Sequence, residues 1–105
     1  VCLHKKKSDK IHQMIIFQKY NYVYGVKKHS KKEKLYLLIS GSQIIKIYDN
    51  KKKIIKTLKL DSNNFICKIP KNNWHNNMTV SKESLHVEII EGPFNRSKDS
   101  IYFNK

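Results

Sequence analysis

The sequence has 105 residues but no alanine, only one arginine (Arg96), two prolines and three glycines. Its two cysteines, Cys2 and Cys67, are too few for a disulfide framework and lack the CxxC spacing of redox or metal motifs, so we expect reduced thiols. No apolar stretch approaches the roughly 18 residues needed to span a bilayer, and because no apolar run follows the basic start we expect no signal peptide. We therefore expect a single cytoplasmic domain, residues 1–105, without a membrane segment.

The shortage of arginine also bears on the formal net charge of +14. Such a charge is typical of proteins that bind nucleic acid, but the bidentate contacts of that class favour arginine forks. Lysine, isoleucine, asparagine and tyrosine are all abundant while alanine is missing, which is the pattern of a genome rich in A and T. We interpret the lysines as solvated strand faces, and we do not expect nucleic-acid binding.

The hydrophobic pattern is that of strands. Short runs rich in β-branched and aromatic residues are separated by turn signals such as Ser40-Gly41-Ser42 and Asp49-Asn50, and no amphipathic helix is evident. Short strands at regular spacing predict an all-β sandwich or barrel. The predicted strands cover residues 14–17, 22–26, 35–39, 44–48, 54–60, 65–69, 73–80 and 85–90, and the tail from residue 95 is expected to lie along the barrel.

Two segments of the second half carry a family resemblance: IPKNNWH at residues 69–75 and HVEIIEGPF at residues 86–94. Together with CLHKKKSDKIHQMII at the start and YVYGVKKHSKKEKLYLLISG in between, they resemble the small cupin proteins of the WbuC-like type. The resemblance covers residues 2–103. It implies a single-domain cupin-type jelly-roll barrel of about eight strands with short terminal segments, and a role in surface polysaccharide, O-antigen or lipopolysaccharide biosynthesis.

The resemblance also implies a cupin metal site, in which three histidines and one carboxylate hold Zn, Fe, Mn or Ni. Where the first motif has His-x-His, this chain has Lys27-Lys28-His29. The ammonium of Lys27 has no lone pair to offer a metal, although its charge could take the place of the metal and bind a phosphate or carboxylate. His29 and His75 remain as candidate metal ligands.

The carboxylate ligand is open between two positions. Counting forward from His29 in the usual family spacing lands on Lys34, which cannot serve. Strand parity instead favours Glu33, which shares a face with Leu35 and Leu37. In the second motif Asn72 stands in place of the usual turn glycine, and asparagine tolerates the positive φ that such a turn requires.

Four further residues are candidates for ligand binding. Trp74 is a core or rim aromatic that could stack on a sugar ring, and the hydroxyl of Tyr24 could act at the mouth of the barrel. His86 and Glu88 share one strand face. Pointing inward, they would join the site, and Glu88 could orient the imidazole of His75; pointing outward, they are an ordinary polar face.

Three functions compete, because a cupin fold does not by itself define an activity. The first is an isomerase or epimerase of a nucleotide-linked sugar, with His75 as general base and Lys27 attracting the diphosphate. The second is a non-catalytic module that binds a small anionic or sugar-like ligand. The third, a metal-dependent oxygenase, ranks lowest because the His-x-His element is broken. A homodimer is the default expectation, by analogy with other cupins.

Overall fold

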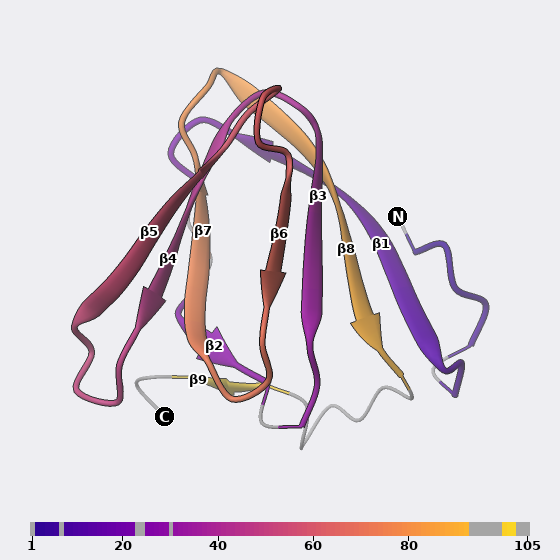
Figure 1. The fold of residues 1–105 in the computed structure, drawn as a ribbon. Helices are drawn as coiled ribbons and strands as arrows, with labels where there is room; N and C mark the ends of the chain where they lie inside the picture. The colour runs from indigo at the N-terminus through magenta and orange to yellow at the C-terminus, as the bar shows by residue number, and fades with distance from the viewer. Residues whose placement is uncertain (1, 7, 23–24, 30, 93–99, 103–105) are drawn as a thin grey trace.

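The computed structural model describes residues 2–6, 8–22, 25–29, 31–92 and 100–102 (Figure 1). The described residues form antiparallel strands and no α-helix, so none of them could cross a membrane as a helix. One sheet has the order β1-β8-β3-β6 and the other β5-β4-β7-β2-β9. The strands are β1 (Ile11–Lys19), β2 (Lys27–Lys28), β3 (Lys34–Ser40), β4 (Gln43–Tyr48), β5 (Ile54–Leu60), β6 (Ile66–Ile69), β7 (Trp74–Thr79), β8 (Glu83–Glu91) and β9 (Ile101–Tyr102).

The predicted all-β jelly roll is confirmed. Seven of the eight predicted segments fall on β1 and β3 to β8, with bounds that differ from those of the strands by at most three residues. The segment predicted over residues 22–26 falls partly on residues 23–24, which lie outside the described residues, and β2 begins just after it at Lys27. In the tail, β9 pairs with β2 through Tyr102 and Ile101, so this part of the chain does lie on the barrel.

Two turns depend on a left-handed backbone. Gly41, between β3 and β4, has φ 83°, and a Cβ added there would lie 2.3 Å from the backbone oxygen of Glu83, so only glycine fits. Asn72, before β7, has φ 65°, and its N–H donates a hydrogen bond to the carbonyl of His29 at 2.7 Å. The asparagine therefore replaces a turn glycine as predicted.

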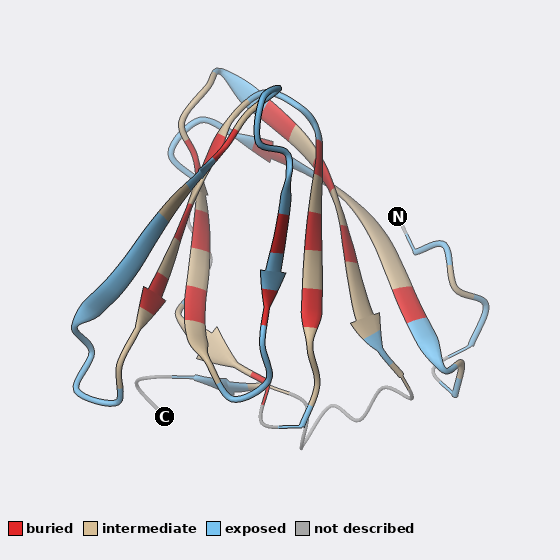
Figure 2. Ribbon diagram, in the orientation of Figure 1, coloured by how far each residue is buried: buried red, intermediate tan, exposed pale blue. Residues whose placement is uncertain are grey.

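The residues that are buried along the strands (Figure 2) fall into an apolar set and a polar set. The apolar part comes from β3 to β6, where alternate residues point inward: Tyr36, Leu38, Ile45, Ile47, Leu60, Cys67 and Ile69 form the buried hydrophobic cluster. The polar part comes mainly from β1, β7 and β8, which bury His12, Gln18, His75, Asn77, Thr79, Ser84, His86 and Glu88. So many buried polar groups must be satisfied by one another or by a ligand.

Candidate ligand-binding pocket

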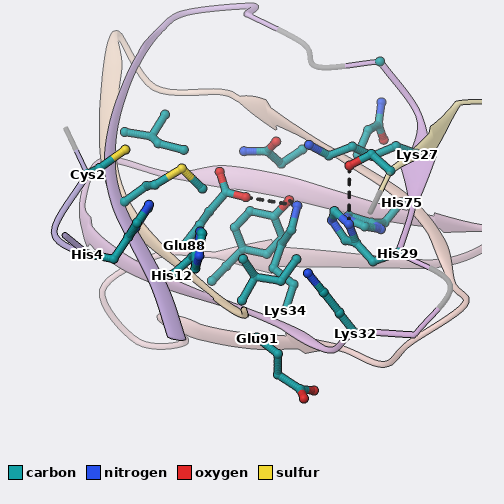
Figure 3. A pocket seen from close by; sticks show the side chains of 18 residues that line it. Cys2, His4, His12, Lys27, His29, Lys32, Lys34, His75, Glu88 and Glu91 are labelled. Carbon is teal, nitrogen blue, oxygen red and sulfur yellow. Dashed lines mark hydrogen bonds and ion pairs between the residues drawn. The ribbon is translucent and has the colours of Figure 1, made fainter. Parts of the chain in front are cut away.

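The barrel encloses a cavity of about 450 Å³, which is in the size range of small-molecule sites (Figure 3). Side chains from both sheets line it, so the barrel itself, and not a surface loop, positions them. The polar and charged members of the lining are His4, His12, Lys27, His29, Lys32, Lys34, Tyr36, His75, Asn76, Asn77, Glu88, Glu91 and Ser100.

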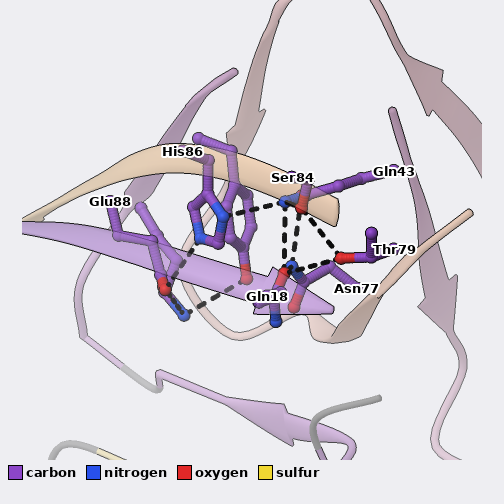
Figure 4. A network of polar contacts seen from close by, with 9 residues as sticks. Gln18, Gln43, Asn77, Thr79, Ser84, His86 and Glu88 are labelled. Carbon is purple, nitrogen blue, oxygen red and sulfur yellow. Dashed lines mark hydrogen bonds and ion pairs between the residues drawn. The ribbon is translucent and has the colours of Figure 1, made fainter. Parts of the chain in front are cut away.

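A hydrogen-bond network fills the barrel beyond the cavity, where β4 begins and β7 ends (Figure 4). The amide nitrogen of Gln43 lies 2.8 Å from Nδ1 of His86 and 2.9 Å from the hydroxyl of Ser84. The oxygen of the same amide accepts from Asn77 at 3.2 Å. Since the amide nitrogen can only donate, Nδ1 of His86 accepts, and the ring carries its proton on Nε2.

That proton faces Glu88, which joins the network to the cavity. Nε2 of His86 donates to Oε2 of Glu88 at 3.2 Å, and the ammonium of Lys34 lies 3.0 Å from Oε1. Burial alone would raise the pKa of the Glu88 carboxyl, but the hydrogen bond from His86 and the charge of Lys34 outweigh burial and lower it to about 2. Glu88 is therefore an ionised carboxylate with a donor on each oxygen.

Lys34 is a buried cation, with an exposed fraction of 3%. Burial is the largest influence on its ammonium and, with a contribution from Lys27, lowers its pKa to about 8 although Glu88 acts in the opposite direction. The ammonium also donates to the hydroxyl of Tyr36 at 3.5 Å. At neutral pH Lys34 is thus charged, and it faces the cavity rather than the solvent outside the barrel.

His75 is fully buried, and its two ring nitrogens have different roles. Nδ1 donates to the backbone carbonyl of Asn73 at 2.9 Å, whereas Nε2 has no hydrogen-bond partner among the described residues. Burial, followed by the charge of Lys34, lowers the pKa of this imidazole to about 3. At pH 7 the ring is neutral, and Nε2 carries a lone pair.

The structure brings several of the predicted site residues together. His75, His29, Lys27 and Glu88 all line the cavity, and the rings of His29 and His75 lie 5.6 Å apart between centroids. His86 points inward but lies behind Glu88 and reaches the cavity only through that carboxylate. The predicted pairing of Glu88 with His75 is wrong, because Glu88 contacts His86 and Lys34, while the carbonyl of Asn73 orients His75.

Two other predicted residues, Glu33 and Trp74, are not in the cavity. Glu33 lies outside the barrel, where its 45% exposed carboxylate pairs with Lys68 at 3.1 Å. Trp74 lies on the outer face of β7, where its indole N–H donates to Asn50 at 2.9 Å and the ammonium of Lys28 lies 4.7 Å from the ring centroid. Trp74 does not line the cavity, so the sugar-stacking role is not supported. Tyr24 lies outside the described residues.

The parity argument for Glu33 failed for a physical reason. It assumed that the apolar face of β3, with Leu35 and Leu37, points into the barrel. Lys34, Tyr36 and Leu38 are the inward residues instead, and the buried ammonium of Lys34 is stabilised there by its ion pair with Glu88. Spacing from His29 was the better guide, since it led to Lys34.

These residues do not fit the cupin metal set. Lys34 occupies the position indicated for the carboxylate and Lys27 that of the first histidine, and neither ammonium can donate a lone pair. Within the described ranges, no three His, Cys, Asp or Glu side chains come together as a metal-binding group. The retained donors are the imidazoles of His29 and His75 alone.

The sequence prediction also did not place Lys34 and Asn77 in the cavity, and it expected Tyr36 as a barrel residue without naming it as a site residue. Lys34 could have been found, because two lysines stand at positions where the cupin motif has metal ligands. Such a pattern indicates that ammonium groups replace the charge of the metal, and not only that the metal ligands are missing. Tyr36 has the same strand parity as Lys34. Nothing in the sequence distinguished Asn77 from other asparagines.

The sheet order and the partly enclosed cavity inside the barrel define a small cupin barrel. The family described as "FdtA: WxcM-like, C-terminal" matches residues 8–102. This chain belongs to that family. A comparison with curated protein sequences finds no match.

Solved structures support the same fold at low sequence identity. The capsular polysaccharide assembling protein CapF from Staphylococcus aureus is 16% identical with a TM-score of 0.81, over 95% of this chain and 30% of that one. Oxalate decarboxylase from Lactobacillus farciminis, in a formate complex, is 14% identical with a TM-score of 0.73, over 90% of this chain and 27% of that one. The oxalate decarboxylase from Bacillus subtilis is 13% identical with a TM-score of 0.74, over 90% of this chain and 24% of that one. The chain thus spans less than a third of the length of these proteins.

Proposed function

We propose that the barrel binds a sugar or nucleotide-linked sugar in surface polysaccharide biosynthesis and isomerises or epimerises it, with His75 as general base. The observation that carries the proposal is Nε2 of His75, a buried lone pair in a ligand-sized cavity with no partner among the described residues. Membership of the FdtA and WxcM-like family and the structural similarity to a capsular polysaccharide assembling protein support the pathway. The proposal includes the role in O-antigen biosynthesis that the WbuC-like resemblance implies, and a cytoplasmic location.

The chemistry assigned to His75 is proton transfer at a carbon next to a sugar carbonyl. Nε2 removes the proton, negative charge passes to the carbonyl oxygen, and return of the proton to a neighbouring position or to the other face completes the reaction. The bond from Nδ1 to Asn73 keeps the lone pair on Nε2. The lysines Lys27 and Lys34 supply positive charge near the developing oxyanion.

One observation favours a second function, non-catalytic binding of a small anionic or sugar-like ligand. The pKa of His75, about 3, makes its ring a weak base in the empty cavity, whereas an efficient base has a pKa near the working pH. A ligand that only donates a hydrogen bond to Nε2 would need no stronger base.

The test is deuterium exchange at sugar carbons. The protein is incubated in D₂O with UDP-, GDP- and dTDP-linked sugars, keto forms included, and ring protons are followed by NMR. We expect exchange in the wild type that slows at least about 100-fold in His75→Asn, while Thr57→Ala on the exposed β5 serves as the matched control. Saturable binding without deuterium exchange would exclude the isomerase and retain the non-catalytic binding function. No binding at all would exclude both functions.

A further inference from the structure

Two lysines stand at positions where the cupin pattern has metal ligands, and both face the same cavity. Lys27 pairs across the β2–β7 ladder with His75, and Lys34 begins β3 with its ammonium inside the barrel. The two are close enough that the charge of Lys27 acts on Lys34. Two ammonium groups held near each other repel, and a shared anion relieves that repulsion.

The ammonium of Lys34 is fixed at the wall of the cavity by its contacts. It lies 3.0 Å from Glu88 and donates to the hydroxyl of Tyr36 at 3.5 Å, and the side chain of Lys27 is within hydrogen-bonding reach of it. Glu88 also lines the cavity, and its other oxygen accepts from His86. These contacts hold the Lys34 cation beside Lys27 at the cavity.

The charge of the lining also favours an anion. Three lysines and two glutamates line the cavity, namely Lys27, Lys32, Lys34, Glu88 and Glu91. The carboxylate of Glu88 forms an ion pair with Lys34, and the exposed Glu91 accepts a hydrogen bond from the backbone N–H of Glu33 at 3.4 Å. Positive charge in a partly enclosed cavity of this kind concentrates anionic ligands.

His75 sets a second requirement, which a plain anion does not meet. Its Nε2 can only accept, because the ring proton is on Nδ1 and is donated to Asn73. A ligand must therefore present a hydrogen-bond donor to His75 and an anionic oxygen to the lysines.

We propose that the cavity is an oxyanion site, in which Lys34 and Lys27 hold a carboxylate or phosphate oxygen while a hydroxyl of the same ligand donates to Nε2 of His75. The proposal rests on the proposed function only in taking this cavity as the ligand site. It narrows the substrate class to a sugar acid or a phosphorylated sugar whose charged group enters the barrel, in place of the metal that the cupin pattern predicts.

The test measures binding of three defined probes to the full chain: D-glucuronate, D-glucose 1-phosphate and neutral D-glucose. Affinity is measured by calorimetry, and the ring signals of His75 are followed by NMR. We expect at least one charged probe to bind 10-fold or more tightly than glucose and to shift the His75 signals. Tighter glucuronate assigns the site to a carboxylate, and tighter glucose 1-phosphate to a phosphate.

The variants separate the two lysines from general charge. Lys27→Met and Lys34→Met should each weaken the charged probe at least 10-fold, while Lys68→Met, in a surface ion pair with Glu33, should leave it unchanged. If Lys34→Met fails to fold with Glu88 unpaired, Lys34→Met combined with Glu88→Gln removes both charges and takes its place. Equal affinity for glucose, or charged-probe binding that survives both lysine variants, overturns the oxyanion site.

This outcome is distinguishable from failure of the proposed function. Charged-probe binding that depends on Lys34, without any exchange of nucleotide-linked sugars, would retain the oxyanion site and exclude the isomerase. Deuterium exchange that persists in Lys27→Met and Lys34→Met would retain the isomerase and exclude the oxyanion site.

Discussion

His75 should make the stability of this protein depend on pH between neutrality and pH 5. Burial and the charge of Lys34 lower its pKa from 6.5 to about 3 in the folded chain. Below pH 6.5 the unfolded chain takes up a proton that the folded chain refuses, so the free energy of unfolding falls as the pH falls. Each pH unit below 6.5 lowers the free energy of unfolding by about 1.4 kcal/mol. Over the roughly 1.5 units from pH 6.5 to pH 5, His75 should therefore account for a loss of about 2 kcal/mol, and almost none of it should occur between pH 7.5 and pH 6.5.

The measurement is urea unfolding at the two pH values, followed by the far-ultraviolet circular dichroism of the β-barrel, for the wild type and for His75→Gln. The variant cannot titrate at this position, so its loss between pH 7.5 and pH 5 should be smaller than that of the wild type by about 2 kcal/mol. All other titratable groups are common to both proteins and cancel in this difference. The same loss in both proteins would show that His75 is not held neutral by its surroundings.

Three further predictions concern the buried polar groups and one turn. Glu88→Gln should lower the free energy of unfolding by about 3–5 kcal/mol, because it leaves the ammonium of Lys34 buried without its counter-charge. Glu33→Gln, which removes one partner of a surface ion pair, should lower it by less than about 1 kcal/mol. Similar losses for the two variants in urea unfolding would contradict the burial argument. Gln43→Leu should cost about 2–4 kcal/mol, since several buried partners lose their hydrogen bonds at once, and a thermal midpoint equal to that of the wild type would disprove this. Gly41→Ala should cost about 1–3 kcal/mol through its positive φ and the contact with Glu83, and an unchanged urea midpoint would show that the turn rearranges freely.

The sequence was a good guide to strands and turns because those depend on local patterns. Apolar runs end at Asp49-Asn50 and Ser40-Gly41, and the strands end there too. The positive φ of Asn72 followed from its place in a motif. These features are set by neighbours along the chain, so a single sequence contains them.

The site was harder to predict because it depends on which face of each strand points inward. In β3 the half-buried leucines Leu35 and Leu37 lie on the outer face, and a lysine lies inside. A rule that places apolar residues inward therefore chose Glu33 over Lys34. The pairing of Glu88 with Lys34 was missed for a related reason, since Lys34 lies on β3 and meets Glu88 of β8 only in the folded barrel.

The hydrogen-bond network around Gln43 has a consequence for traffic into the barrel. It fills the interior beyond the cavity with directional bonds, including one between Thr79 and Ser84 at 2.8 Å (Figure 4). A ligand cannot pass through this end without breaking several of them, so the route in is also the route out. Under the proposed function, product would have to leave before the next substrate arrives, and a nucleotide attached to the sugar would extend from the opposite end of the barrel. An enzyme that hands over the substrate or collects the product would have to approach from that same side.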